Sequence, residues 1–480
     1  MATMKTPGVY IVDRNPFPNS VVEAATAVPA FVGHTALADN DGKPLHGKPW
    51  RITSMAEYER HFGGAAPARF RIERVAATAP TPALPDMLEP RGQCDDFQHG
   101  ATTYRLTRAA GRAGGRFLMH QAMRLFFRNG GGPCHVVSVG GFDDEIAAGD
   151  VATGLIGGLT PLLKESEPTL LVLPDAVLLS RADCMRVQKT ALQHCGGEMK
   201  NRFAVLDVWG GDLARRHPAG DCIARFRDDI GTDFLSYGAA YFPWLHASVS
   251  RAEDLDAGHF DNADDLAALL RDDPGLLEPL LTEARKQLDL LPPSAAMAGL
   301  YTMVDNTRGV WKAPANVSLA AVIAPAVDIT HEDQEDLNVT PQGKSINAIR
   351  TFIDEGVLVW GARTLDGSSL DWRYVNVRRT MIMLEESCRL AAKALVFEPN
   401  GAGTWMTLKS MLDNFLIGLW KRGALAGSVP EDAFSVHVGL GDTMTPGDVL
   451  EGLLGVTVLV AISRPAEFIE ITFQQQMQKT

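Results

Sequence analysis

Both ends of this chain carry segments with the pattern of an extended strand, and this feature constrains the fold more than any other. Near the last residues, Ile469, Ile471 and Phe473 alternate with polar side chains, which is the period-two pattern of a strand with one buried face. Residues 6–12 form a second apolar run near the first residues. An apolar strand at a terminus, where chains usually fray, either pairs inside its own domain or adds to the sheet edge of another subunit. The two patterns alone leave both possibilities open.

Length and composition limit the class of protein. A chain of 480 residues is too long for one hydrophobic core, so we expect two to four domains. The formal net charge of -13 argues against nucleic acid as the main partner, because phosphate binding needs a basic face. Six scattered cysteines without a Cys-x-x-Cys pair predict neither a structural zinc site nor a disulfide framework.

The first residues contain no apolar segment typical of a secretory signal, and the chain has no run of eighteen apolar residues. We therefore expect a protein made in the cytoplasm without a signal peptide and without a transmembrane helix. A role outside the cell would require release by lysis or export within a larger particle.

Strands and helices alternate in the first two thirds of the chain. Apolar runs predict strands at residues 136–139, 170–173 and 203–206, and a helix that begins after Ser180 lies between the last two. Strand, helix and strand at this spacing form a βαβ unit in a parallel, helix-covered sheet. Residues 65–115 are rich in proline and alanine and have poor periodicity, which predicts an insertion, either a surface excursion or a small extra subdomain, with little core of its own. Residues 250–291 are polar and acidic and predict solvent-facing helices.

The last third is the most regular part of the sequence. Apolar side chains at four-three spacing predict a long helix over residues 377–395, and a second helix is expected from about Thr404 to Arg422, ended by Gly423. Strands around residues 435–439 and 455–462 follow. The whole pattern predicts an α+β, multidomain protein.

No motif predicts a catalytic, cofactor or metal site. Gly343-Lys344-Ser345 is similar to the end of a phosphate-binding loop, but Asn338 stands where its first glycine should be. His331-Glu332 lacks the second histidine of a zinc protease helix. The best enzymatic lead is the pair Asp175 and Asp207, near the C-terminal ends of two predicted parallel strands, where α/β enzymes place their sites. A turn or helix-start role is the simpler interpretation of Asp175.

Segments spread in order over nearly the whole chain resemble contractile tail sheath proteins, and most closely the sheaths of phage tail-like extracellular contractile injection systems. The segments are residues 6–11 (TPGVYI), 25–35 (ATAVPAFVGHT), 124–132 (RLFFRNGGG), 235–244 (LSYGAAYFPW), 292–299 (PPSAAMAG), 309–316 (GVWKAPAN), 346–347 (IN), 360–364 (WGART), 374–379 (YVNVRR) and 397–400 (FEPN). The insertion at 65–115 departs from shorter relatives.

The resemblance implies a domain plan and a role for the two ends. It implies an N-terminal linking arm (1–28), an outer α/β domain (29–64 and 116–291) with the insertion (65–115), a conserved C-terminal sheath domain (292–464) and a C-terminal linking arm (465–480). The arms would add strands to the sheets of neighbouring subunits. The linking residues would be Val9, Tyr10, Ile11 and Val12 at one end and Phe468, Ile469, Ile471 and Phe473 at the other.

The resemblance also implies partners and a mechanism. The chain would polymerise helically around an inner tube protein, together with baseplate and cap proteins and with sister sheath chains where they exist, without nucleic acid and without membrane insertion. It would contract from a metastable extended state, as a structural protein and not an enzyme, with no cofactor. Lys421, Arg422 and Leu425 would face the tube. For the two basic residues, satisfying the dipole at a helix end is an equally good explanation.

Three other functions stay open at this point. The chain could be the sheath of a true contractile-tailed bacteriophage, a rigid tube or scaffold protein with one lattice geometry, or an α/β enzyme with a ligand near Asp175 and Asp207.

Overall fold

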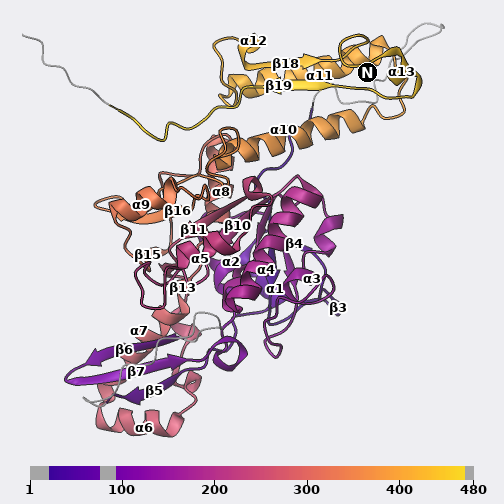
Figure 1. Ribbon diagram of the computed structural model, residues 1–480. Coiled ribbons are helices and arrows are strands. Elements are labelled where there is room, and N and C mark those ends of the chain that lie inside the picture. The colour runs from indigo at the N-terminus through magenta and orange to yellow at the C-terminus, as the bar shows by residue number, and fades with distance from the viewer. Residues whose placement is uncertain (1–20, 76–92, 471–480) are drawn as a thin grey trace, which may run out of the picture. The chain divides into compact units, whose positions relative to one another are not determined.

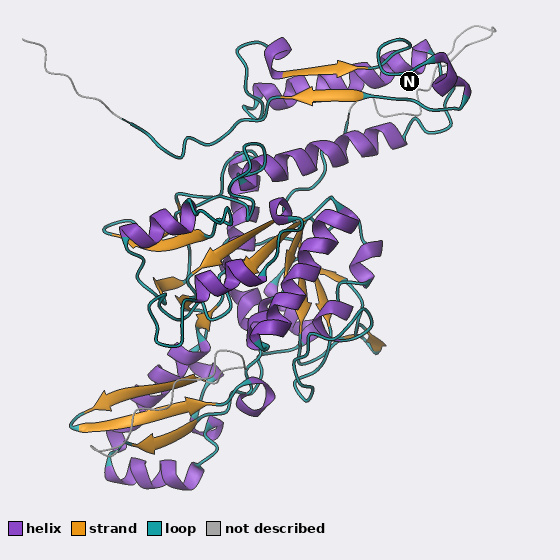
Figure 2. Cartoon of the chain, in the orientation of Figure 1, coloured by secondary structure: helices purple, strands orange, loops and turns teal. Residues whose placement is uncertain are grey.

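The computed structural model describes residues 21–75 and 93–470 (Figures 1 and 2). The described chain forms two compact units: a larger one of residues 25–382 and 464–470, and a smaller one of residues 21–24 and 383–463. In the sequence, one of the boundaries between the two units lies within helix α10 (Val375–Lys393). These bounds differ from those of the domain plan that the family resemblance implied. The α+β, multidomain fold class is confirmed.

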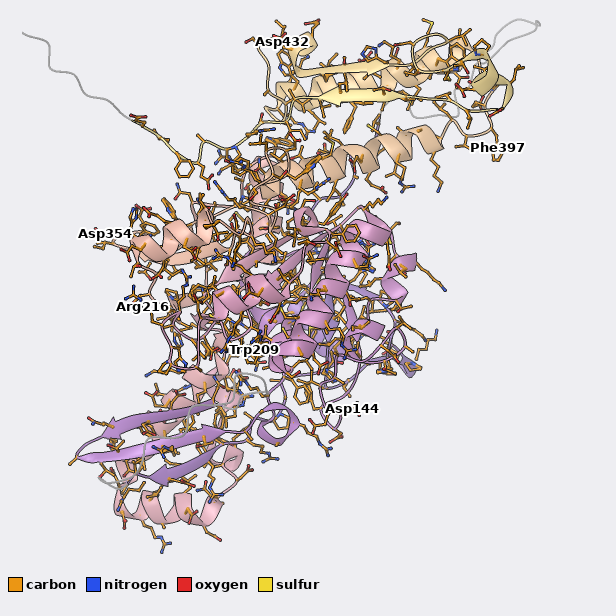
Figure 3. The ribbon with its side chains drawn as sticks, in the orientation of Figure 1. Asp144, Trp209, Arg216, Asp354, Phe397 and Asp432 are labelled. Carbon is orange, nitrogen blue, oxygen red and sulfur yellow. The ribbon has the colours of Figure 1, made fainter. Side chains whose placement is uncertain are left out.

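A nine-stranded sheet is the centre of the larger unit (Figure 2). Six neighbouring strands run parallel, and antiparallel strands extend both edges. In spatial order the strands are β14 (Val317–Ser318), β17 (Gly356–Val359), β16 (Asn347–Phe352), β11 (Gly238–Phe242), β10 (Phe203–Asp207), β9 (Leu170–Val172), β1 (Pro29–Gly33), β8 (Cys134–Ser138) and β4 (Trp50–Ile52). Asp354, labelled in Figure 3, occupies the turn between β16 and β17 with a positive φ of 66°. Strands from both sides of residue 292 share this sheet, so the predicted domain border there does not separate two bodies.

Both faces of the sheet are covered, since every residue of β1, β8, β10 and β11 is buried. The predicted βαβ unit is confirmed: β9 and β10 pair in parallel, and α4 lies between them in the chain with Ser180 accepting from the Asp183 N–H. This unit includes the helices α1 (Met55–Phe62), α2 (Met119–Arg128), α3 (Gly154–Gly157), α4 (Arg181–Leu192), α5 (Cys222–Asp229), α8 (Ser294–Arg308) and α9 (His331–Asn338). Smaller pairings join β2 (Asp39–Asn40) to β3 (Lys43–Pro44), and β12 (Leu245–Ala247) to β13 (Leu290–Leu291) and β15 (Val322–Pro325).

The insertion shares a hydrophobic core with a later part of the chain. It forms a three-stranded sheet of β5 (Arg71–Arg74), β7 (Thr102–Arg108) and β6 (Gln93–His99). Helices α6 (Ala263–Asp272) and α7 (Leu277–Leu288) supply the facing apolar side chains, among them Leu266, Leu280 and Leu288. Seven of the twelve buried residues in this core lie between Leu255 and Leu288, so the insertion itself contributes less than half of it.

The smaller unit contains the end of α10, helix α11 (Ala402–Lys421), and strands β18 (Phe434–His437) and β19 (Thr457–Val460). Short helices α12 (Pro430–Ala433) and α13 (Pro446–Leu450) flank the strands (Figure 1). All four predicted elements of this region are present within a few residues of the expected bounds. Among the described residues, no helix has the length and apolar character needed to cross a membrane.

Candidate functional site: an open-edged sheet and two anchored chain ends

The most unusual feature of the smaller unit is its two-stranded sheet. β18 and β19 pair antiparallel, with Phe434 opposite Val460 and His437 opposite Thr457. Within the described part of the chain neither strand has another strand beside it. A two-stranded sheet is marginally stable by itself and presents unpaired backbone groups at its edges. Its stability here comes from helix α11, which packs against it.

The side chains of the two strands follow the period-two pattern of a sheet with one covered face. Val436 is buried and lies opposite Val458, on the face that receives the apolar side of α11. On the other face Leu459 is exposed. The sheet therefore has a packed face, an open face and two lateral edges.

The hydrogen-bond pattern shows which backbone groups point to the edges. The Ala461 N–H donates to the Ala433 carbonyl at 2.8 Å, one position before the paired strands. Because hydrogen-bonded and non-hydrogen-bonded pairs alternate in an antiparallel ladder, the backbone groups of Val458 and Val460 point away from β18. On β18 the groups of Phe434 and Val436 point away from β19 by the same rule.

The two edges are not equivalent. Lys409 of α11 donates from Nζ to the carbonyl oxygen of Val436, so an outward acceptor of the β18 edge already has a partner. No side chain in the described residues is bonded in this way to the outward groups of Val458 or Val460. Lysine is one of the residues that natural proteins use to protect a strand edge. The β19 edge is the more accessible of the two.

The predicted tube-facing residues do not form one exposed cluster. Lys421 is the last residue of α11 and is exposed, whereas Leu425 is buried and forms a bridge with Ile462. Arg422 pairs with Glu23 at 2.6 Å.

Of the predicted arm residues, Phe468 and Ile469 lie in an extended segment with 74% and 79% of their surface exposed. Val9, Tyr10, Ile11, Val12, Ile471 and Phe473 lie outside the described residues.

The chain segment next to the N-terminal arm is anchored to the smaller unit. Besides the Glu23–Arg422 pair, the Ala24 N–H donates to Ser387 Oγ of α10 at 2.9 Å. The Glu23 and Arg422 side chains are 35% and 49% exposed, so water screens their attraction and the pair contributes little stability.

The segment next to the C-terminal arm is anchored much more firmly, to the larger unit, through Glu467. Its carboxylate accepts from Arg363 Nε at 2.9 Å and Arg363 Nη2 at 2.6 Å, from Asn338 Nδ2 at 2.7 Å and from Tyr374 Oη at 3.0 Å. Burial of Glu467 favours its neutral form, but hydrogen bonds from Arg363 and Asn338 outweigh this effect and the pKa of the carboxyl is lowered. We call these four residues the Glu467 clasp. Sequence reasoning missed it, although Arg363 and Tyr374 both lie in segments that carry the family resemblance.

The two carboxylates of the enzymatic alternative have structural partners. Asp175 is fully buried and accepts the backbone N–H groups of His34 and Leu118, each at 2.8 Å. Asp207 begins helix α8 by accepting from the Ser294 N–H at 2.8 Å and from Ser294 Oγ at 2.5 Å. Burial raises the pKa of Asp207 to about 7. Both groups fix loops and helix starts, and neither faces a cavity identified in the described chain.

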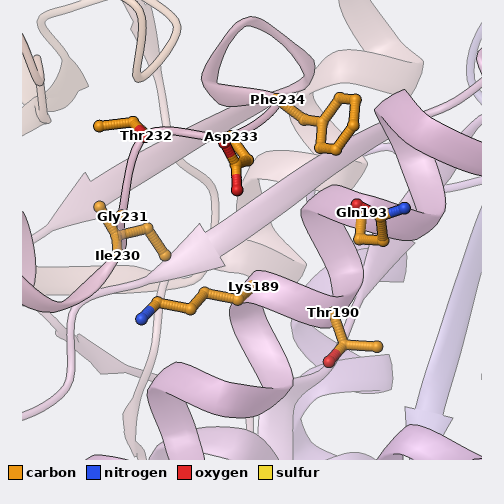
Figure 4. A pocket seen from close by; sticks show the side chains of 8 residues that line it. All are labelled: Lys189, Thr190, Gln193, Ile230, Gly231, Thr232, Asp233 and Phe234. Carbon is orange, nitrogen blue, oxygen red and sulfur yellow. The ribbon is translucent and has the colours of Figure 1, made fainter.

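One cavity of about 370 Å³ lies beside α4 (Figure 4). It is lined by Lys189, Thr190, Gln193, Ile230, Gly231, Thr232, Asp233 and Phe234. Its charged residues Lys189 and Asp233 are exposed to solvent, so no buried polar group is directed at a ligand. In the described residues no group of three or more His, Cys, Asp or Glu side chains could hold a metal ion.

Sequence comparisons relate the chain to tail sheath proteins. Residues 368–476 match the family model of the phage tail sheath C-terminal domain. The tail sheath protein of Vibrio phage KVP40 is 24% identical over 187 residues, which is 38% of this chain and 26% of that protein. The tail sheath protein of Burkholderia phage BcepMu is 29% identical over 143 residues, 29% of this chain and 30% of that protein. The alignments thus span less than a third of these curated relatives.

Structural similarity extends over the whole chain. The contracted helical sheath of the anti-feeding prophage is 29% identical with a TM-score of 0.63, covering 99% of this chain and 100% of that one. The contracted PVC sheath complex of an extracellular contractile injection system is 27% identical with a TM-score of 0.61, covering 99% of both chains.

Proposed function

This chain has the C-terminal domain and the fold of contractile tail sheath proteins, and from this premise we propose that it is the repeating subunit of a contractile sheath. Copies polymerise helically around an inner tube in a metastable extended state. Contraction of the sheath then drives the tube through a target envelope. The protein acts as a structural component and not as an enzyme.

The observation that carries the proposal is the open-edged sheet of β18 and β19, in a chain similar over 99% of its length to contracted sheath subunits. Strand addition supplies the missing neighbours: one arm of a neighbouring copy, through Val9–Val12 or Phe468–Phe473, pairs with β19 and another pairs with β18. The arm on the β18 edge displaces Lys409 from the Val436 carbonyl. Main-chain hydrogen bonds give such contacts their affinity, and alternate side chains give them specificity.

Strand linkage suits a lattice that changes shape. The backbone ladder between an arm and its acceptor keeps two subunits joined, while the bodies outside the ladder rotate and slide. Rigid-body rearrangement between two stable sets of interfaces is an established way for assemblies to switch. The energy is stored at assembly, so contraction requires no nucleotide in the sheath.

The partners follow from this arrangement. The first is the chain itself, and an inner tube protein fills the sheath. Baseplate proteins begin the polymer and cap proteins end it. A baseplate of the anti-feeding prophage contains a similar chain, 29% identical over 99% of this one. Lys421 and Arg422, at the end of α11, are proposed to face the tube.

The particle is proposed to be a phage tail-like injection system, made in the cytoplasm and released from the cell. The whole-chain similarity to the anti-feeding prophage and PVC sheaths favours this over the tail of a true bacteriophage. The phage relatives align over less than a third of their own length, which keeps a phage tail as the second candidate.

Truncation tests the proposal. A variant that ends at Glu467 loses the C-terminal arm but keeps the clasp, and the full chain is its control. The full chain should form hollow cylinders in negative-stain electron microscopy, while the truncated protein stays monomeric with an unchanged melting temperature. Cylinders formed by the truncated protein would refute the linkage.

A further inference from the structure

The Glu467 clasp holds its carboxylate from three separate segments of the larger unit. Asn338 ends helix α9, Arg363 follows β17, and Tyr374 precedes α10. Arg363 supplies two parallel N–H donors, the arrangement that gives charge-assisted pairs both strength and a fixed geometry.

The donors are themselves held rigidly. The Arg363 N–H donates to Asn347 Oδ1 at 2.7 Å, and the Arg363 carbonyl accepts from Asn347 Nδ2 at 2.8 Å. Arg363 also donates from Nη1 to the Asn338 carbonyl at 3.1 Å and forms an antiparallel bridge with Tyr374. A receptor already fixed before the ligand group arrives loses little entropy when the group binds.

Burial distinguishes this anchor from the one at the other end of the chain. The Arg363 and Glu467 side chains are 4% and 19% exposed, against 49% and 35% for Arg422 and Glu23. Water therefore screens the N-terminal pair far more than the C-terminal one.

Glu467 is the last residue of this segment that the larger unit holds by buried contacts. Phe468 and Ile469 are exposed, and the Glu470 side chain makes no hydrogen bond or ion pair within the described part of the chain. On the other side, Arg464 and Asp371 form only an exposed pair at 3.7 Å. The strand-like segment thus starts directly after the one buried contact.

We propose that Glu467 is a positioning residue: it fixes the root of the C-terminal arm to the larger unit and presents the strand from Phe468 onward to a second copy of this chain from one defined point. This inference rests on the proposed function. Without the clasp, residues 464–467 would be released together with the arm, since the nearest preceding backbone hydrogen bond is that of Ser463, whose N–H donates to the Ala424 carbonyl at 3.1 Å. A longer, freely rotating tether lowers the effective concentration of the arm at its acceptor.

The clasp also determines where tension on the arm acts. Residues 461–463 are paired with 424–426 through the Leu425–Ile462 bridge and the Ala426 N–H to Ala461 carbonyl bond of 2.7 Å. If Glu467 were not bound, tension on the arm would break these hydrogen bonds one after another, starting at the end of β19. When the clasp is closed, tension on the arm acts on the Glu467 side chain and its three partners. The hydrogen bonds of the acceptor sheet in the same subunit then stay intact during contraction.

The first test measures opening of the clasp with endoproteinase Glu-C, which cuts after glutamate. The double variant Asn338→Ala, Tyr374→Phe removes two donors but keeps the Arg363–Glu467 pair, so no buried charge loses its partner. Cleavage after Glu467 in the full chain should become about tenfold or more faster, because it follows the population of the open clasp. Cleavage after Glu470 should be unchanged and serves as the internal control.

The second test measures assembly. Glu467→Gln and the double variant should assemble at least about tenfold more slowly than the wild type. The double variant should melt within a few degrees of the wild type, whereas Glu467→Gln leaves the buried Arg363 guanidinium without its anionic partner and should melt lower. Glu470→Gln, which changes the same charge three residues later, should assemble normally. Wild-type assembly by both clasp variants, with the chain truncated at Glu467 inactive, overturns the positioning role and leaves the sheath function standing. Assembly by the truncated chain itself refutes the arm linkage.

Discussion

Blocking the β19 edge should prevent polymerisation without unfolding the subunit. The substitution is Val458→Pro, at the centre of the strand. The backbone groups of Val458 and Val460 point to the open edge, so an incoming strand can form up to four hydrogen bonds with them. Proline removes the N–H at 458, and its ring keeps the incoming strand from the carbonyl beside it.

The expected loss of binding free energy between the incoming strand and β19 follows from this geometry. Two of the four bonds are lost, and each contributes about 0.5–1.5 kcal/mol net. Strand pairing should weaken by about 1–3 kcal/mol, or roughly 5- to 150-fold in the equilibrium constant. The ladder to β18 keeps its bonds, because the Val458 N–H does not take part in it.

The assay is the critical concentration for polymerisation, measured by sedimentation. Val458→Thr is the matched control, because it keeps the branched shape and the N–H while losing the apolar packing. Val458→Pro should raise the critical concentration well above that of Val458→Thr, with both proteins folded by circular dichroism. Equal critical concentrations for the two variants would refute strand addition at this edge.

Three further predictions concern other parts of the chain. Lys409→Met frees the Val436 carbonyl at the β18 edge, so dilute subunits should associate faster by light scattering; an unchanged rate would show that Lys409 does not protect this edge. Asp305→Asn breaks the buried pair with Arg379, joined at 2.6 Å, and should destabilise the protein by about 3 kcal/mol in urea unfolding, whereas Asp371→Asn, at an exposed pair, should change stability little. The folded pKa of Asp207, about 7, lies above its unfolded value, so the folded state binds the extra proton and the free energy of unfolding should fall by up to about 1.4 kcal/mol per pH unit from pH 5 to 7. Asp207→Asn should flatten this slope, and a slope unchanged in that variant would assign it to another group.

Local patterns in the sequence were sufficient to predict the elements but not their assembly. The four-three spacing of apolar residues predicted α10, a second set of apolar positions predicted α11, and apolar runs predicted β9 and β10 on either side of a helix that begins after Ser180. Those signals depend on neighbouring residues. The core of the insertion depends on Leu266 and Leu280 meeting a sheet formed by residues 71–74, 93–99 and 102–108, and no local pattern shows that contact.

The candidate site was also only partly predictable, because some of its features follow from local patterns and others from contacts between distant segments. The strand pattern after Glu467 is visible in the sequence, whereas the clasp requires Asn338, Arg363 and Tyr374 to converge on one carboxylate from three segments. The burial of Leu425 was likewise not visible in the sequence, because it results from pairing with Ile462, 37 positions later in the chain. The βαβ geometry likewise placed Asp175 and Asp207 at strand ends correctly, while their use as acceptors for backbone N–H groups was not visible in the sequence.

The central claim is that this chain forms a lattice with two stable geometries. Electron microscopy of native particles, with this subunit located by a specific antibody, tests it most directly. The sheath account predicts labelled striated cylinders in two forms, long and narrow around a tube and short and wide after contraction. Labelled cylinders of a single diameter under every condition would identify a rigid scaffold, and labelled discrete particles without cylinders would contradict the sheath function altogether.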